Sequence, residues 1–416
     1  MTSGTPSNKR SNAAGMQAGG RIPPLDGFRA AFVFSVMAFH LWQQSWLTPT
    51  FTLFGHWVSL DPFLRTGYLW VDGLLLLSGF LLYLPTARAA EAGRALPGFS
   101  GFYTRRAWRI VPTYLLNLLV VFLVVALPEK RYATFWAAAR DWLAHLSFTH
   151  PFFAFSSINT PLNGALWTVG VEVQFYLLFP LIARAFRRLP LVTYVLLGAV
   201  AFLFRAHAIQ VAQSPMLVNQ LPAFLDVYLN GFVAAMVYAR LERRGRDGGP
   251  RRILFSAAML VSALGLMILV NRQAALRAIS EVRAGQLRIR YLQSVLSAIM
   301  LLGGSLGLGG VRWLLGNRVA GFLAAISYQV YLWHQVIALQ LKKWRVPDSA
   351  SPNPHMTGDR RWQVAYVLLV CALTLLISWA VTFFIEQPLY GLPGRARGSK
   401  AEKPGNNPRK QGEGQA

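Results

Sequence analysis

Cysteine, acidic side chains and several common motifs are scarce or missing in this sequence. The 416 residues include a single cysteine, Cys371, which excludes a disulfide framework and a cysteine-based metal site. The seven histidines contain no pair four residues apart and no HExxH motif, so we expect no bound metal. A Walker loop and a GxGxxG fingerprint are also missing, which leaves nucleotide hydrolysis and hydride transfer without support.

What the sequence has instead is long apolar runs. Hydrophobic residues make up 54% of the chain and the mean hydropathy is +0.38, and many runs approach the ~20 residues needed to cross a bilayer. The 41 Lys and Arg residues, against 16 Asp and Glu, lie mostly in short connections and tails. That distribution is typical of topology signals and anionic lipid contacts, not of nucleic-acid binding. The sequence therefore predicts an all-α polytopic membrane protein.

The apolar runs predict a bundle of about ten transmembrane helices. The expected spans are 25–47, 67–86, 108–128, 164–183, 190–207, 220–239, 252–271, 289–309, 319–341 and 362–386. The transmembrane domain is thus expected over 25–390, between a polar N-terminus, 1–24, and a basic tail, 391–416, both expected to be disordered. No cleavable signal peptide is expected, because the first run is long enough to remain as an anchor.

The basic connections predict the orientation of the bundle. Lys and Arg concentrate in the N-terminus and in the second, fourth and sixth connections, which places both termini in the cytoplasm. The seventh and ninth connections, on the expected outer side, are also basic, so either a late span is misassigned or these loops bind something anionic. The third connection, 128–163, is longer and contains an amphipathic piece over 136–146, expected to be a short surface helix.

The first expected span carries two polar residues on one face. Arg29 and His40 are eleven residues apart, which returns to within about 20° on a helix. With a rise of ~1.5 Å per residue they lie ~16 Å apart along the axis, one near the membrane surface and one deeper. This arrangement suggests a buried site. The alternative is a snorkelling arginine and a histidine bonded to a neighbouring helix.

Carboxylates inside two other spans are candidate partners of the histidine. Asp72 in the second span could orient His40 or pair with it, and the alternative is a residue at the outer helix end. Glu172 lies deep in the fourth span with Tyr176 one turn away on the same face. Its candidate roles are acid/base partner, histidine orienter or ligand of a sugar hydroxyl, against a structural buried pair.

Arginines at the start of the third span form a candidate anion site. Arg105, Arg106 and Arg109 occur in FYTRRAWRIVPTYLL, and Arg106 and Arg109 are one turn apart. Two guanidinium groups present planar forks of N–H donors that suit phosphates. The ordinary alternative is positive-inside anchoring.

Two further spans carry polar residues along one helix face. Such a stripe either lines a cavity or seals a contact between helices, and spacing alone does not separate these possibilities. In the sixth span, Asp226 and Asn230 share a face. In the ninth span, Ser327, Tyr331 and His334 do so.

The ordered motifs resemble the acyltransferase-3 family of membrane acyltransferases. They are Arg29-x10-His40, WVDGLLLLSGFLL, RRAWRIVPTY, LWTVGVEVQFYLLFP, ISYQVYLWHQ and FIEQPL, in register over about 22–390. The resemblance implies transfer of an acyl group, usually acetyl, from cytoplasmic acyl-CoA to a hydroxyl on a carbohydrate or glycosylated acceptor. The chain resembles stand-alone members, which modify exopolysaccharides, lipopolysaccharide sugars or macrolide-type antibiotics, and a place in the bacterial inner membrane is expected.

The resemblance also implies site roles. His40 is then the catalytic general base, helped by Glu172 or Asp72, and no cofactor is bound beyond the acyl-CoA co-substrate. The residues expected at acyl-CoA are Arg29, Arg105, Arg106 and Arg109, and those expected at the acceptor are Trp167, Tyr176, Asp226, Tyr331 and His334. The competing hypothesis is a proton-coupled transporter or exporter that uses the same buried polar residues as a relay.

Overall fold

The structure of the protein, a computed structural model, describes residues 20–95, 99, 101–211, 215–243 and 249–389. The expectations for 1–19 and for the tail from 390 lie outside this part. The elements in chain order are α2 (Pro24–Ser45), β1 (Thr50–Leu53), β2 (His56–Ser59), α3 (Asp61–Arg65), η1 (Gly67–Leu69), α4 (Trp70–Glu91), α5 (Phe102–Val121), η2 (Phe122–Ala126), α6 (Phe135–Leu146), η3 (His150–Phe152), α7 (Ala154–Ser157), η4 (Gly164–Leu166), α8 (Trp167–Arg188), α9 (Pro190–Gln210), α10 (Pro215–Val218), η5 (Leu221–Phe224), α11 (Leu225–Arg243), α12 (Gly249–Ala274), α13 (Ile279–Leu306), α14 (Gly309–Gly316), α15 (Arg318–Lys343), α16 (Arg360–Val381) and η6 (Thr382–Glu386).

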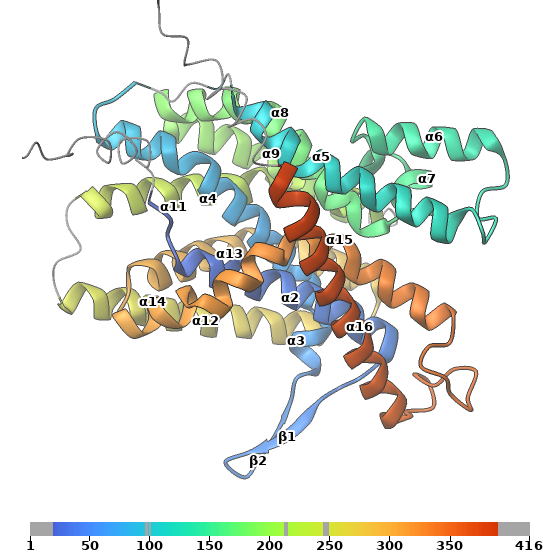
Figure 1. Ribbon diagram of the computed structural model, residues 1–416. Coiled ribbons are helices and arrows are strands. Elements are labelled where there is room, and N and C mark those ends of the chain that lie inside the picture. Colours follow the sequence, from blue (N-terminus) through green and yellow to red (C-terminus); the bar gives the residue numbers. More distant parts are fainter. Residues whose placement is uncertain (1–19, 96–98, 100, 212–214, 244–248, 390–416) are drawn as a thin grey trace, which may run out of the picture.

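Long helices packed side by side form the bundle (Figure 1). Within the described residues, nine helices are long and apolar enough to cross a membrane. The remaining predicted span is α2, whose 22 residues include Asp26, Arg29 and His40. The predicted all-α class is therefore confirmed, with the β1–β2 hairpin as a short addition that the sequence analysis did not anticipate.

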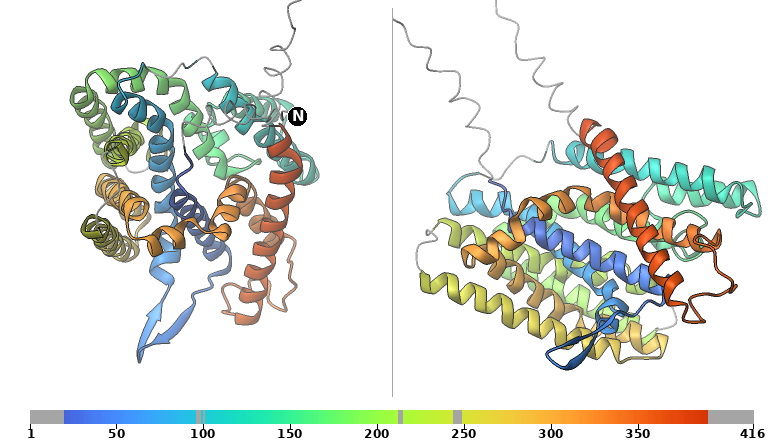
Figure 2. Two further views of the ribbon diagram at one scale, coloured as in Figure 1. Left: turned by 60° about the vertical axis from the view of Figure 1, so that its left-hand side comes forward. Right: turned by 60° about the horizontal axis from the view of Figure 1, so that its bottom comes forward.

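The polar residues of α2 are compatible with its place inside the bundle. Figure 2 shows this helix near the centre of the helices, where it packs against α4 and α15. Leu25, Phe28, Phe32 and Val36 are all buried in these contacts. A helix surrounded by protein needs less apolar surface than one that faces lipid, which explains its lower hydropathy.

Glycines bring α4 and α11 into close contact. A Cβ atom on Gly79 would lie 2.5 Å from the carbonyl oxygen of Tyr228, and one on Gly231 would lie 2.3 Å from that of Leu76. Small residues allow such backbone approach in membrane helices. This close contact fixes the rotation of α4 about its axis. It thereby positions Ser78, next to Gly79, in the site described below.

The amphipathic helix predicted over 136–146 is confirmed as α6. The Thr134 hydroxyl accepts a hydrogen bond from the amide of Ala137, which caps its first turn. Phe135 and Trp136 are each more than three-quarters exposed, as expected of a helix at a membrane surface.

Helix α13 begins ten residues before the predicted start of its span at 289, at Ile279. The part of α13 before residue 289 was not predicted as part of the span, because its arginines lower the hydropathy of the sequence. Arg290 of the same helix is fully buried, and its charge is neutralised by an ion pair within the bundle. The extension contains Arg283 and Gln286, which line a cavity.

Glu129 links the end of the η2 segment to α15, and this contact predicts a pH-dependent stability. A hydrogen bond from Lys343 at 2.6 Å is the main reason that the pKa of Glu129 is lowered to about 2. A carboxyl group whose pKa is lowered in the folded protein stabilises the folded state at pH values above its ordinary pKa. That stabilisation is lost as the pH falls toward 2. Glu129→Gln should therefore lower the melting temperature at pH 7, and the difference from the wild type should narrow at pH 3.

The control for this measurement is Glu281→Gln, which removes an exposed carboxylate on α13. It should give no comparable pH-dependent difference in detergent. A Glu129→Gln deficit of equal size at both pH values would contradict the assignment.

Candidate active site

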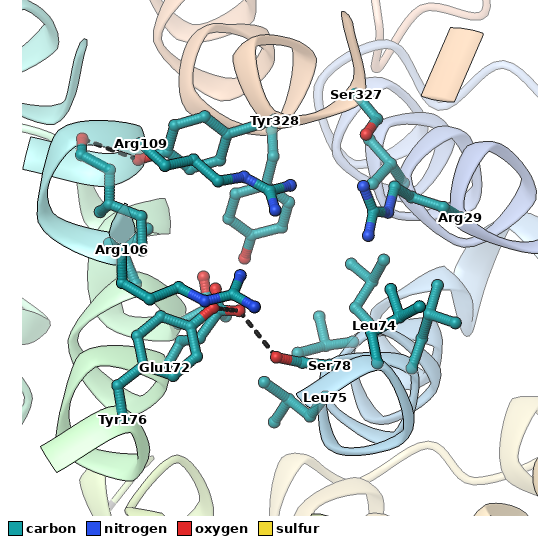
Figure 3. Close-up of a pocket in the computed structure, with 18 residues that line it drawn as sticks. Arg29, Leu74, Leu75, Ser78, Arg106, Arg109, Glu172, Tyr176, Ser327 and Tyr328 are labelled. Carbon is teal, nitrogen blue, oxygen red and sulfur yellow. Dashed lines mark hydrogen bonds between the residues drawn. The ribbon is translucent and has the colours of Figure 1, made fainter. Parts of the chain in front are cut away.

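Three arginines from two helices meet in a cavity of about 150 Å³, called here the arginine cavity. Figure 3 shows Arg29 of α2 reaching in from one side, and Arg106 and Arg109 of α5 from the other. The polar lining residues are Arg29, Ser78, Arg106, Arg109, Thr168, Glu172, Tyr176, Ser327, Tyr328 and Tyr331. The structure thus brings together most of the residues expected at acyl-CoA, from segments far apart in the sequence.

The arginine cavity carries an excess of positive charge. Among the described residues that line it, Glu172 alone is acidic. Its Oε1 accepts hydrogen bonds from Ser78, at 2.9 Å, and from the Tyr176 hydroxyl. None of the three guanidinium groups forms an ion pair with another described residue. The Arg106 guanidinium lies over the ring of Tyr176, 5.2 Å from its centroid. Arginines arranged in this way suit an anionic ligand such as a phosphate.

His40 lines a second cavity of about 230 Å³, called here the histidine cavity. Its lining residues are Val36, Phe39, His40, Tyr68, Val71, Trp167, Val218, Asn219, Arg283, Gln286 and Tyr331. It lies where α2 ends and where α4, α8 and α13 begin. Val71 and Tyr331 line both cavities, so the two meet at these side chains.

The neighbours of His40 define which ring nitrogen is free. Its Nδ1 lies 2.9 Å from Oε1 of Gln43, which only accepts hydrogen bonds, so Nδ1 donates and Nε2 keeps its lone pair. The ring of His334 lies 5.1 Å away, centroid to centroid. His334 likewise donates from Nδ1 to the Val330 carbonyl at 2.9 Å, and its buried Nε2 has no hydrogen-bond partner among the described residues. Two imidazole rings, each held by a hydrogen bond at Nδ1, therefore lie side by side.

Comparison with known proteins decides the family. The family described as "Acyltransferase domain", acyltransferase-3, matches residues 22–383, most of the chain. This chain belongs to the acyltransferase-3 family. Acyltransferase MdmB of Streptomyces mycarofaciens is similar to this chain: it is 27% identical over 405 residues, which cover 91% of this chain and 94% of that protein.

Other relatives match over shorter segments. Peptidoglycan O-acetyltransferase OatA of Listeria monocytogenes is 26% identical over 38% of this chain, and the match covers 24% of OatA. Nodulation protein 10 of Rhizobium leguminosarum is 30% identical over 37% of this chain and 42% of its own length. The chain therefore spans less than half of these two relatives. No solved structure gives a significant match.

Several residues expected at the site of this acyltransferase-3 member lie in or beside the two cavities. Trp167 and Tyr331 line the histidine cavity, and Tyr176 lies in the arginine cavity with Glu172. His334 contacts the His40 ring. Arg105 differs: it is exposed and does not line the arginine cavity, because it precedes Arg106 by one residue on α5 and points about 100° away.

Two carboxylates assigned to the site from sequence are bound elsewhere. The expectation that Asp72 pairs with His40 is wrong, because its Oδ2 lies 3.1 Å from Nε of Arg290. Asp226 was expected at the acceptor, but it forms a buried ion pair with Arg205, with bonds of 2.8 and 2.6 Å. Glu172 lies in the arginine cavity and does not line the histidine cavity.

The Asp72–Arg290 pair predicts a large loss of stability on removing one partner. Both side chains are at most 1% exposed, so Asp72→Ala would leave a buried, uncompensated guanidinium. We expect a cost of about 3–5 kcal/mol in the free energy of unfolding. The double variant Asp72→Leu with Arg290→Leu should recover much of that loss, as measured by unfolding in detergent. A single variant as stable as the wild type, or a double variant no better than the single one, would contradict the pairing.

Four polar residues around His40 were not predicted from the sequence. Gln43 lies one helical turn from His40 in the sequence, but only carboxylates were predicted as orienters of the imidazole. Asn219, Arg283 and Gln286 reach the cavity only through tertiary packing. Among the described residues, no group of three or more His, Cys, Asp or Glu side chains could hold a metal ion.

Proposed function

We propose that this acyltransferase moves an acyl group, acetyl in the simplest case, from acyl-CoA to a hydroxyl of a carbohydrate or glycosylated acceptor. The observation that supports this best is the meeting of the arginine and histidine cavities at Val71 and Tyr331. The anion site can hold the phosphates of the acyl-CoA donor, and the imidazole next to it can act as the base. The relative named as a peptidoglycan O-acetyltransferase supports a carbohydrate acceptor.

In this proposal the arginine cavity holds the donor. Arg29, Arg106 and Arg109 bind phosphates of acyl-CoA, and the thin pantetheine arm extends along α2 toward Tyr331. The ~16 Å expected between Arg29 and His40 is of the same order as such an arm. Holding the phosphates in this way places the thioester at the junction of the cavities, within reach of the imidazole.

His40 acts as general base in the transfer. Its Nε2 takes the proton of the acceptor hydroxyl while that oxygen attacks the thioester carbonyl carbon. The tetrahedral intermediate then collapses, the carbon–sulfur bond breaks, and the leaving thiolate takes the proton from the imidazolium. The products are an ester and free CoA. Gln43 holds the tautomer, a positioning role that the sequence analysis had assigned to Asp72 or Glu172.

The positions of the two cavities along α2 support transfer across the membrane. Arg29 lies near the start of α2 and His40 near its end. With the N-terminus in the cytoplasm, as the basic connections predict, the arginine cavity takes acyl-CoA from the cytoplasm. The histidine cavity is then reached from the outer side of the bacterial inner membrane.

Purified protein in detergent tests the proposal against a transporter. Incubation with acetyl-CoA should release CoA and, with a sugar acceptor, yield an ester that mass spectrometry detects as one added acetyl group. A proton-coupled exporter needs a gradient and would give neither product. Absence of both from folded protein would overturn the proposal.

A further inference from the structure

The α13 face of the histidine cavity has no role in the reaction described so far. Arg283 and Gln286 lie one turn apart in the first turns of α13, and both line this cavity. Asn219, from the chain just before η5, adds an amide. Side chains with planar polar groups therefore lie within one cavity of 230 Å³ together with the catalytic imidazole.

The charge of this face is positive and unbalanced. Arg283 forms no ion pair with any residue that the structure describes, and no Asp or Glu lines the histidine cavity. Nearby buried charges are already neutralised, because Arg290 pairs with Asp72 and Arg205 pairs with Asp226. A guanidinium facing a partly enclosed cavity without a carboxylate favours an anionic ligand.

Aromatic side chains complete the surface. Trp167 and Tyr68 line the same cavity, and the Tyr68 hydroxyl oxygen accepts a hydrogen bond from Gln273 at 2.8 Å. Its own O–H is therefore free to donate to a ligand. An aromatic ring beside amide and guanidinium groups suits a sugar ring, which presents both apolar C–H faces and hydroxyls.

We infer that the histidine cavity binds an acidic sugar, with Arg283 and Gln286 holding its anionic group while a ring hydroxyl lies at His40. The inference rests on the proposed function, since it assigns the acceptor of that reaction. It also accounts for one arginine of the basic seventh connection expected from the sequence, because Arg283 lies in the part of that segment that forms the start of α13. The anion is either a carboxylate of the sugar or a phosphate attached to it.

Matched acceptor pairs test this inference. The first pair is p-nitrophenyl β-glucuronide and p-nitrophenyl β-glucoside, which differ in a carboxylate. The second is glucose 1-phosphate and methyl glucoside, which differ in a phosphate. With radiolabelled acetyl-CoA as donor, the wild type should favour the anionic member of one pair by about tenfold in kcat/KM, mainly through KM. The pair that shows the preference identifies the anion.

Variants of α13 show whether Arg283 causes the preference. Arg283→Gln should abolish it, and Arg283→Lys should keep part of it, because the charge remains and the forked geometry is lost. The control is Arg288→Gln, which removes an exposed arginine on the same helix that does not line the cavity. That variant should show the wild-type preference.

The outcomes that overturn the inference differ from those that overturn the proposed function. Equal use of both members of each pair, acetylation of none of them by protein that releases CoA in a His40-dependent way, or a preference unchanged in Arg283→Gln overturns the acidic acceptor. CoA release that does not depend on His40 overturns the proposed function instead.

Discussion

His40→Ala should reduce acyl transfer by about 10²–10⁴-fold while the protein stays folded. The proposed reaction needs a base at the acceptor oxygen, and His40 is the residue of the histidine cavity whose Nε2 keeps its lone pair, because Nδ1 donates to Gln43. The substitution removes a partly exposed side chain, so little packing is lost. The loss should fall on kcat rather than on the KM for acyl-CoA. Transfer to a fixed acceptor and thermal unfolding of the same preparation measure both properties.

Three further histidine and glutamine variants separate chemistry from structure. His207→Ala removes an exposed histidine on α9 that lines neither cavity, and it should retain wild-type activity. Gln43→Ala should lose part of the activity, because it releases the His40 ring from its hydrogen bond. His334→Ala tests whether the neighbouring imidazole contributes. A folded His40→Ala variant with full activity would remove His40 from the mechanism.

Arg106→Ala and Arg109→Ala should each raise the KM for acyl-CoA by about 10- to 100-fold. A hydrogen bond to a charged group is worth about 1.5–3 kcal/mol, and about 1.4 kcal/mol corresponds to a tenfold change in affinity. Both guanidinium groups line the arginine cavity without a carboxylate partner among the described residues. The KM for the acceptor should change little, since the acceptor is placed in the other cavity. Steady-state kinetics with each substrate varied in turn measures the two effects.

One lysine substitution and one variant of a neighbouring arginine provide the controls. Arg106→Lys should recover only part of the affinity, because a lysine has no planar fork. Arg105→Ala changes an exposed residue on the same helix outside the cavity, so it should leave the KM for acyl-CoA unaltered. An unchanged KM in both Arg106→Ala and Arg109→Ala would show that the pair serves topology alone.

The helices could be predicted from the sequence because crossing a bilayer requires long apolar runs. Each expected span corresponds to a helix, and α2 was expected even though its polar residues lower its hydropathy. Arg29, Arg106 and Arg109 were expected together at acyl-CoA, and all three line the arginine cavity. Glu172 was expected to help His40 but lies with the arginines instead.

The partners of buried charges could not be predicted from spacing. Asp72 and Arg290 are 218 residues apart in the sequence, and only the packing of α4 and α13 brings them together. The same holds for Asp226 and Arg205 on neighbouring helices. Local patterns show that a charge is buried but not which residue compensates it, so Asp72 was mistaken for a partner of His40.

The central claim is that the arginine and histidine cavities form one path along which acyl-CoA reaches His40. A structure of the protein in complex with a thioether analogue of acetyl-CoA tests it most directly. The account predicts phosphate density beside Arg106 and Arg109, with the acyl group near Tyr331 and His40. Phosphates bound elsewhere, or an acyl group that ends in the arginine cavity with Tyr331 closing the way to His40, would contradict it.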